Sequence, residues 1–175
     1  MNAILKRRSI RKYKDKKISD DIVEELLRAG MAAPSAVNEQ PWQFIVLRDK
    51  ETMKKITKVH EYSKMLLEAN LAIVVCGDKS KELVDDFWVQ DCSAATENIL
   101  IEAQDKGLGA VWLGVYPIKE RVDGIKEILN LPEGITPLSV IPIGYPDEDK
   151  EPTDRFSKER VHYDRWQFIK CKDCS

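Results

Sequence analysis

The residues best suited to chemistry lie near the start of the chain, in the stretch "RRSIRKY" at residues 7–13. It places Arg7, Arg8 and Arg11 around Ser9 within five positions. Guanidinium groups stay charged at physiological pH and repel one another, so clustering them is favourable only opposite an anion. The stretch therefore predicts an anionic partner. The alternative is a solvated basic helix end, because runs of charge are often surface.

A second stretch, "AAPSAVNEQPW" at residues 32–42, combines polarity with stiffness. Pro34 and Pro41 restrain the backbone, while Ser35, Asn38 and Gln40 offer hydrogen-bond donors and acceptors. Groups that are already held in place lose less entropy on binding. We interpret the stretch as a preorganised binding loop; a plain connection between a helix and a strand is the alternative.

The other reactive side chains lack the spacing of a catalytic or metal motif. The sequence has no GxGxxG, GxxxxGK[ST], HExxH or GxSxG. His60 ends an amphipathic pattern and is interpreted as a partner of the helix dipole rather than a catalyst. Cys171 and Cys174 form one CxxC near the chain end, which could be redox-active or bind zinc, or could be two free thiols. We predict no metal site and no essential acid or base.

Charge and composition narrow the class of protein. The 175 residues are 43% hydrophobic and 33% charged, typical of one globular protein. The net charge is −2, but residues 1–17 carry eight basic residues and one acid, a balance of +7 that leaves −9 for the rest. A basic arm on an acidic body argues against a broad nucleic-acid-binding face. No apolar run approaches the ~20 residues of a membrane span, and we predict a cytoplasmic protein.

The elements that must position these stretches alternate between helix and strand. Ser19 predicts a helix start and Gly30 its end. We expect further helices over 51–60, 81–106 and 118–129, and strands over 43–48, 71–77, 110–114 and 137–146. Because Pro137 and Pro142 cannot donate hydrogen bonds, the last strand is predicted to be an edge or irregular strand. The class is α/β or α+β, with one sheet between helical layers.

The periodic pattern fades after Pro146. The tail is polar but carries Phe156, Tyr163, Trp166 and Phe168 without a core of its own. We therefore predict a main domain over residues 1–150 and a C-terminal arm over 151–175 that docks on a second subunit.

Four stretches together resemble the nitroreductase family of FMN-dependent oxidoreductases. "RRSIRKY", "AAPSAVNEQPWQFIVL", "GLGAVWLGVYP" and "IPIGYPDE" occur in the family's order and rough spacing, over nearly the whole chain. The resemblance implies an α+β three-layer sandwich with a central mixed sheet. It also implies an intertwined homodimer with FMN bound at the subunit interface. Longer members carry a helical insertion over the substrate pocket; here residues 60–110 leave little room for one.

The resemblance also implies a set of FMN-binding residues. Arg7, Arg8, Ser9 and Arg11 match the N-terminal flavin-binding segment, so the anion would be the FMN phosphate. Leu113 and Gly114 match a dipeptide whose N–H groups meet the flavin ring near N5 and O4. The loop that reaches the flavin from the other subunit is matched by Pro34, Ser35, Ala36 and Asn38. Arg155 matches a late basic residue on the phosphate, with Arg160 as its rival.

The predicted activity is transfer of electrons from NADH or NADPH through FMN to an oxidised small acceptor, such as a nitroaromatic or a quinone. FMN accepts and releases the electrons, while the protein orients the FMN ring and provides N–H donors to it. Two alternatives stay open: a non-catalytic module that senses or stores FMN, and a small nucleic-acid-binding domain that uses the basic arm.

Overall fold

The structure, a computed structural model, describes residues 3–167. Its helices are α1 (Ala3–Lys6), α2 (Asp20–Met31), α3 (Lys50–Val59), α4 (Trp88–Asp105) and α5 (Lys119–Leu129). Its strands are β1 (Trp42–Leu47), β2 (Leu71–Asp78), β3 (Gly109–Ala110), β4 (Leu113–Gly114) and β5 (Ile135–Gly144). Ser19 caps α2 by accepting a hydrogen bond from the Ile22 N–H, as predicted.

One sheet organises the chain. The strand order is β1-β2-β5-β3, and β4 also pairs with β5. The pairings between these named strands are antiparallel. The parallel component is the isolated bridge between Ser9 and Ala110, which joins the basic N-terminal stretch to β3. The mixed character expected of the sheet therefore rests on that bridge.

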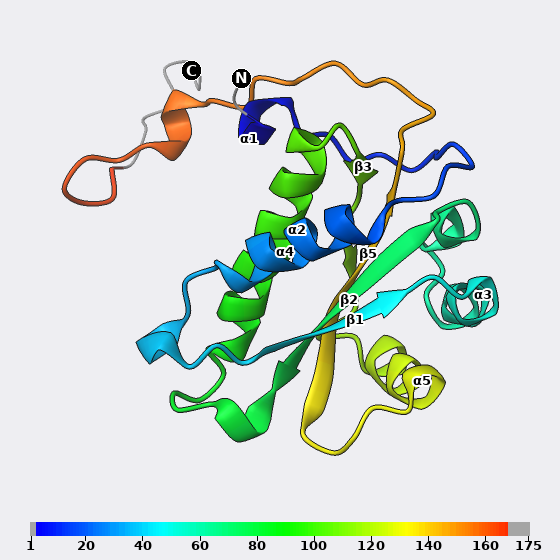
Figure 1. Ribbon diagram of the computed structural model, residues 1–175. Coiled ribbons are helices and arrows are strands. Elements are labelled where there is room, and N and C mark those ends of the chain that lie inside the picture. Colours follow the sequence, from blue (N-terminus) through cyan, green and yellow to red (C-terminus); the bar gives the residue numbers. More distant parts are fainter. Residues whose placement is uncertain (1–2, 168–175) are drawn as a thin grey trace, which may run out of the picture.

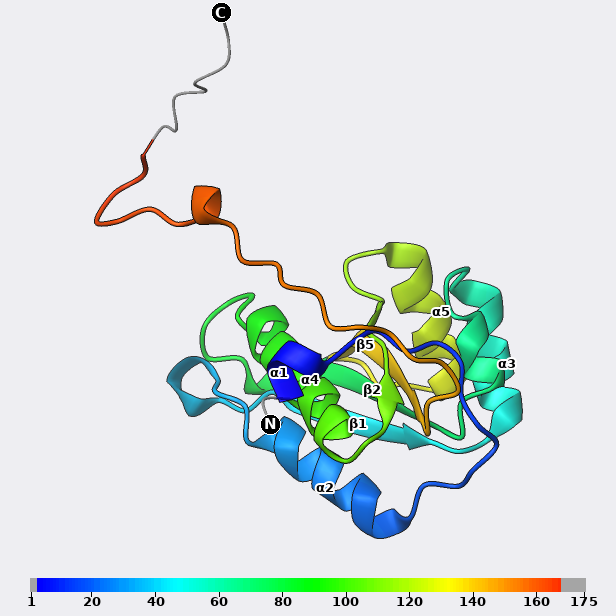
Figure 2. The same ribbon diagram turned by 90° about the horizontal axis from the view of Figure 1, so that it is seen from above.

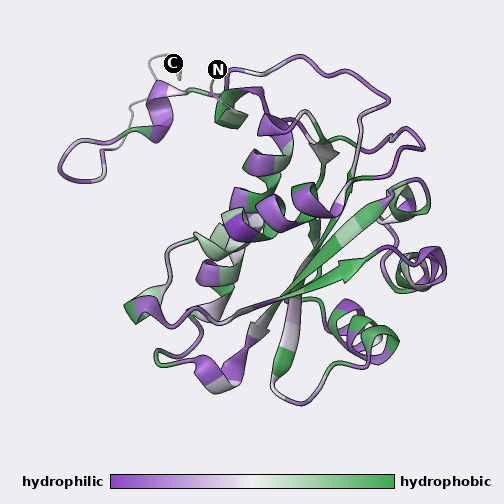
Figure 3. Cartoon of the chain, in the orientation of Figure 1, coloured by the Kyte–Doolittle hydropathy of each residue, from purple (hydrophilic) through white to green (hydrophobic). Residues whose placement is uncertain are grey.

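Helices cover both faces of the sheet and make three layers (Figure 1). One apolar cluster joins α2 and α4 to one face, and a second joins α3 and α5 to the other. Figure 3 shows the apolar colour concentrated on the sheet, with hydrophilic residues on the outer helix surfaces. The predicted α+β three-layer sandwich is confirmed.

The residues of β2 explain why it lies inside the sandwich. Leu71, Ile73 and Val75 pack into the α2/α4 cluster, while Ala72 and Val74 pack into the α3/α5 cluster. Alternate side chains of a strand point to opposite faces, so a strand buried on both sides needs a continuous apolar run.

Of the two alternatives predicted for the last strand, the edge position is wrong, because β5 lies between β2 and the short strands β3 and β4, and the irregular strand is confirmed by a register shift in its pairing with β2. Its prolines are accommodated by irregularities. Pro137 lies beside the register shift between Val75 and Cys76. Pro142 falls between the residues that pair with β3 and those that pair with β4. The expected strand over 110–114 is accordingly split in two.

The long helix predicted over 81–106 begins seven residues later, at Trp88. Asp86 has a φ of 64°, a left-handed conformation that interrupts a right-handed helix. Leu83 and Phe87, whose spacing would place them on the apolar face of such a helix, are 74% and 39% exposed. Apolar spacing alone did not reveal this break.

After β5, residues 145–150 run along the basic N-terminal stretch, and the C-terminal segment then leaves the body of the molecule (Figure 2). Phe156, Tyr163 and Trp166 are each more than two-thirds exposed. Cys171, Cys174 and Phe168 lie outside the described residues. Within residues 3–167, no helix is both long enough and apolar enough to cross a bilayer.

Candidate functional site

Five of the predicted residues line one basic cavity of about 340 Å³. Its lining consists of Arg7, Arg8, Ser9, Arg11, Lys150 and Arg155. Arg7 donates to the Glu97 carboxylate at 3.1 Å, and Arg8 donates to Thr153 Oγ1 at 2.7 Å and to the Glu151 carbonyl. None of the hydrogen bonds or ion pairs within the described residues involves the guanidinium of Arg11 or Arg155. No carboxylate lines this cavity, so its chemistry suits an anion.

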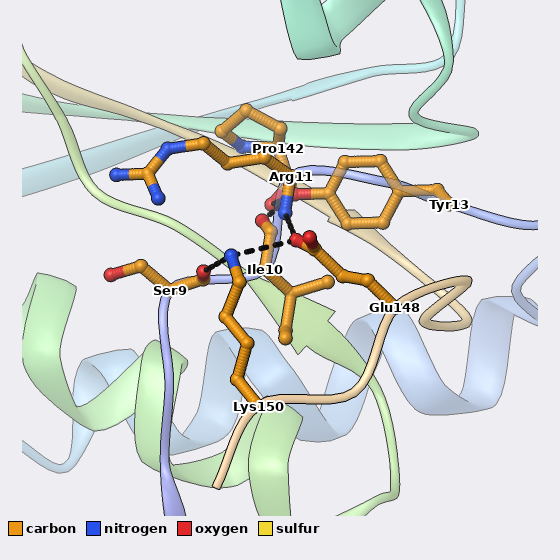
Figure 4. Close-up of polar contacts among 7 residues, drawn as sticks. All are labelled: Ser9, Ile10, Arg11, Tyr13, Pro142, Glu148 and Lys150. Atoms are coloured by element: carbon orange, nitrogen blue, oxygen red, sulfur yellow. Dashed lines mark hydrogen bonds and ion pairs between the residues drawn. The ribbon is translucent and has the colours of Figure 1, made fainter. Parts of the chain in front are cut away.

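Glu148 and Lys150 hold the backbone of the basic stretch (Figure 4). Glu148 Oε1 accepts from the Arg11 N–H at 2.6 Å and from Lys150 Nζ at 2.9 Å. Lys150 Nζ also donates to the Ser9 carbonyl at 2.8 Å. Burial alone would raise the pKa of Glu148, but these hydrogen bonds lower it below its ordinary value. Glu148 is therefore a carboxylate at neutral pH and restrains the backbone that carries Arg11.

Tyr13 supplies a second anchor for the same stretch. Its buried hydroxyl donates to the Ile10 carbonyl at 2.7 Å and lies 3.2 Å from the Pro142 carbonyl of β5. Burial raises the pKa of Tyr13 far above its ordinary value, so the hydroxyl keeps its proton. The arginines therefore sit on a backbone tied to the central strand (Figure 4).

A second cavity of about 500 Å³ adjoins the first, because Arg11 lines both. The other lining residues are His60, Glu61, Tyr62, Lys64, Met65, Trp112, Leu113, Gly114 and Arg121. We call it the β4 cavity. A Cβ placed on Gly114 would meet no atom within 4 Å, so the backbone there is open to close approach by a ligand.

The interpretation of His60 as a charged dipole partner is wrong. The residue is 2% exposed, and its Nε2 lies 3.0 Å from the Gly114 carbonyl rather than against the end of α3. Burial, and then the charge of Arg121, lower the pKa of His60. The imidazole is therefore neutral near pH 7.

The predicted loop around residues 34–38 lines neither cavity. The segment 34–38, which contains Pro34, Ser35, Ala36 and Asn38, lies near the N-terminal end of α4 and away from α1 (Figure 1). The Ala36 N–H donates to Asp91 Oδ1 at 3.1 Å. Val37, Asn38 and Gln40 have φ values of 41°, 60° and 49°. Non-glycine residues rarely adopt this conformation, so the loop is strained as well as stiff.

Asp91 anchors that loop from α4 and is itself 5% exposed. Burial raises the pKa of Asp91, and the carboxylates of Glu39 and Glu82 add to the rise, against the lowering by the Ala36 N–H. Its Oδ2 is buried without a hydrogen-bond partner in residues 3–167. The same part of the chain holds no group of three or more His, Cys, Asp and Glu side chains suited to a metal ion.

Sequence reasoning missed three positive side chains of the two cavities. Lys150 completes the basic cavity, while Lys64 and Arg121 line the β4 cavity. None lies in a dense motif, and each reaches its cavity through tertiary contacts, so no usable signal for them was present in the sequence. Arg160, the rival of Arg155, lies in a short 3-10 turn at 158–160 and lines neither cavity.

The fold and these cavities define a class: a three-layer α+β sandwich with a basic cavity beside β3. The profile of the nitroreductase family matches residues 4–61 and 57–145. A protein of Archaeoglobus fulgidus, provisionally named NADH dehydrogenase/NAD(P)H nitroreductase, is 51% identical over 170 residues, covering 95% of this chain and 98% of that protein. The chain therefore belongs to the nitroreductase family, which confirms the resemblance.

Two solved structures support the same family assignment. A provisionally named NADH oxidase from Clostridium acetobutylicum is 48% identical with a TM-score of 0.91, over 94% of this chain and 99% of that one. An FMN-dependent nitroreductase from Clostridium difficile is 32% identical with a TM-score of 0.88, at the same coverage.

Proposed function

We propose that this protein is an FMN-dependent oxidoreductase that takes hydride from NADH or NADPH and passes electrons to an oxidised small acceptor, such as a nitroaromatic or a quinone. The observation that carries the proposal is the pair of cavities joined at Arg11. FMN has a phosphate at one end and a polar aromatic ring at the other, so one molecule matches a basic cavity next to an open strand. The names of the relatives from Archaeoglobus fulgidus and Clostridium difficile support the same chemistry.

The basic cavity would hold the phosphate. Arg7 and Arg8 are already oriented by Glu97 and Thr153. In this proposal Arg11 and Arg155 supply guanidinium groups that no described acceptor uses, and Ser9 supplies a hydroxyl. Paired hydrogen bonds from arginine to phosphate oxygens are among the stronger polar contacts in proteins.

The β4 cavity would hold the ring. The cations Arg11, Lys64 and Arg121 line it, and the backbone of Leu113 and Gly114 opens onto it. FMN, when bound, accepts the hydride and releases the electrons. The protein's part is to orient the ring and to place positive charge and N–H donors where negative charge develops.

We include a homodimer in the proposal. The strained loop with Pro34, Ser35, Ala36 and Asn38 lines no cavity of its own chain that contains the arginines. A second copy could bring this loop to the site, as the family resemblance implies. Ile4, Leu5 and Phe156 line a further opening beside the basic cavity and are more than 60% exposed, which suits burial against a partner. The arm over 151–175, which supplies Phe156 to this opening, would dock on the second subunit, and a cytoplasmic location remains part of the prediction.

The proposal also includes the kinetic order. One cleft would admit NAD(P)H and the acceptor in turn, so NAD(P)⁺ would leave before the acceptor binds. No side chain is assigned as an essential acid or base. With the protein saturated with FMN, substitution of His60, His162 or Cys171 should therefore change flavin reduction by only a few-fold, far below the ~10²–10⁴-fold effect of a general acid or base.

The test begins with the purified protein. It should be yellow, or become so with added FMN, and anaerobic NADH or NADPH should bleach it. An added nitroaromatic or quinone should then restore the colour, and initial-rate plots should be parallel. A protein that binds FMN but passes no electrons would be a flavin-binding module, and one that never binds FMN would overturn the proposal. Intersecting plots would reject the alternating occupancy alone.

A further inference from the structure

Two side chains from different helices converge on one backbone carbonyl in the β4 cavity. His60, just after α3, places Nε2 3.0 Å from the Gly114 oxygen. Arg121, in the first turn of α5, donates from Nη1 to the same oxygen at 3.0 Å. A carbonyl oxygen has two lone pairs, so these two contacts saturate it.

The chemistry of the oxygen fixes the tautomer of His60. A carbonyl can only accept, so Nε2 must carry the hydrogen. Nδ1 then holds a lone pair, and it is buried with no hydrogen-bond partner in the part of the chain that the structure describes. A proton on Nδ1 would place an unpaired charge in a buried site near Arg121, and the nearby Glu61 carboxylate is already 3.7 Å from Arg121. The neutral Nε2–H form is the one that fits.

Gly114 needs such restraint more than a typical strand residue. β4 is two residues long, and its pairing in the sheet is with β5. No atom lies within 4 Å of where a Cβ of Gly114 would be, so side-chain packing does not fix its orientation. Glycine is also the least restricted residue in backbone conformation. The Gly114 carbonyl belongs to the Gly114–Val115 peptide, whose N–H, on Val115, donates to the Leu138 carbonyl at 2.9 Å. The orientation of this peptide therefore depends on hydrogen bonds at both of its polar groups.

We propose that His60 and Arg121 are positioning residues that clamp the Gly114 carbonyl and so fix the Leu113–Gly114 backbone against the bound ring. The inference rests on the proposed function, since that backbone matters to FMN only if FMN binds there. Neither side chain is assigned a step on the reacting atoms. Besides the positive charge of Arg121 in the cavity, each side chain orients the Gly114–Val115 peptide and so, through the backbone angles of Gly114, the direction of the Gly114 N–H.

The affinity test uses the FMN-loaded protein and matched pairs of variants. His60→Phe keeps a planar ring but removes the donor, whereas His60→Gln keeps a donor that can reach the oxygen. Arg121→Met and Arg121→Lys form the second pair. One net hydrogen bond contributes about 0.5–1.5 kcal/mol, so we expect His60→Phe and Arg121→Met to weaken FMN binding roughly two- to tenfold.

For the same variants, the reduction potential and the absorption spectrum of bound FMN can be measured, and a purely structural role of the side chains would leave both unchanged. His60→Phe and Arg121→Met should shift the reduction potential and the visible absorption bands of bound FMN, and the Gln and Lys variants should restore both. If the melting temperature falls while affinity, potential and spectrum stay at their wild-type values, the clamp is only structural and the inference is wrong. If His60→Phe does not fold, the comparison of Arg121→Met with Arg121→Lys decides the question. Arg121 lies on α5, in an outer layer of the sandwich, with 15% of its side chain exposed.

The tautomer can be tested without FMN. The chain has two histidines, so ¹⁵N-labelled imidazoles give two sets of signals, and His162→Asn assigns them. His60 should show the Nε2–H form and stay neutral to a lower pH than an ordinary histidine side chain. An Nδ1–H form, or titration of His60 at the ordinary histidine value or above it, would overturn the inference. Failure of the proposed function is distinct: the wild-type protein would then bind no FMN while the tautomer held.

Discussion

Replacing Arg155 by alanine tests whether the basic cavity binds the phosphate end of FMN rather than its ring. Arg155 lines the basic cavity and not the β4 cavity, whereas Arg11 lines both. Alanine at 155 breaks no hydrogen bond or ion pair of a described side chain. At Arg11, the N–H that Glu148 accepts is a backbone group, which alanine retains. Neither substitution should therefore disturb the fold, so the loss of affinity reports contact with the ligand.

The expected size follows from the kind of contact that is lost. A hydrogen bond to a charged group contributes roughly 1.5–3 kcal/mol, which is about 10- to 150-fold in Kd. Arg155 is exposed, so solvent screening places it near the lower end, at about tenfold for FMN. Riboflavin lacks the phosphate and should bind the Arg155→Ala variant within about twofold of wild type. Arg11→Ala should weaken the binding of both ligands.

Titration of the apoprotein, followed by quenching of flavin fluorescence, measures these four affinities. Arg28→Ala is the matched control, because Arg28 is an exposed arginine paired with Glu24 on α2, outside both cavities. It should change neither affinity. Equal losses of FMN and riboflavin affinity in Arg155→Ala would refute the assignment of the phosphate to the basic cavity.

Three further predictions test the parts of the structure that surround the two cavities. Asp91→Asn should raise the melting temperature near pH 7. Folding raises the pKa of Asp91, so the wild-type protein loses stability as the pH rises from the ordinary aspartate value through the raised one. The variant lacks this carboxyl group, and its melting temperature should fall less over that range. Gly77→Ala should cost roughly 1–3 kcal/mol in urea unfolding, since its Cβ would lie 2.3 Å from the Trp88 ring; Gly114→Ala should keep that stability but weaken FMN binding. Deleting 151–175 should lose both FMN and a dimer that light scattering otherwise detects on dilution.

The sequence predicted most of the fold because the controlling signals are local. The continuous apolar run of β2 and the Ser19 cap of α2 each lie within a few residues. The errors arose where tertiary structure decides. Pro142 suggested an edge, but the split between β3 and β4 leaves room for a missing donor inside the sheet. The late start of α4 depends on the turn at Asp86.

The candidate site was predictable to the extent that its residues are neighbours in sequence. Arg7, Arg8, Ser9 and Arg11 share one extended stretch, so their clustering was visible directly, whereas Arg155 came from the family resemblance. Lys150 and His60 gave no usable signal. Their partners, the Ser9 and Gly114 carbonyls, are 141 and 54 residues away in sequence. Backbone acceptors look alike in every sequence, so such contacts emerge only when the chain has folded.

The location of β5 connects the stability of the fold to the assembly of the site. β5 pairs with β2, β3 and β4, and the chain then returns directly to Glu148 and Lys150, which hold the backbone of Ser9 and Arg11. The two cavities therefore form only when the central strand is in place. A ligand that fits them binds the folded state alone and stabilises it by RT ln(1 + [L]/Kd), about 2.7 kcal/mol at a concentration of 100 Kd. When no anion is present, the repulsion among the arginines lowers the free energy of unfolding. The basic stretch that indicated an anionic partner therefore also makes the stability of the fold depend on that partner.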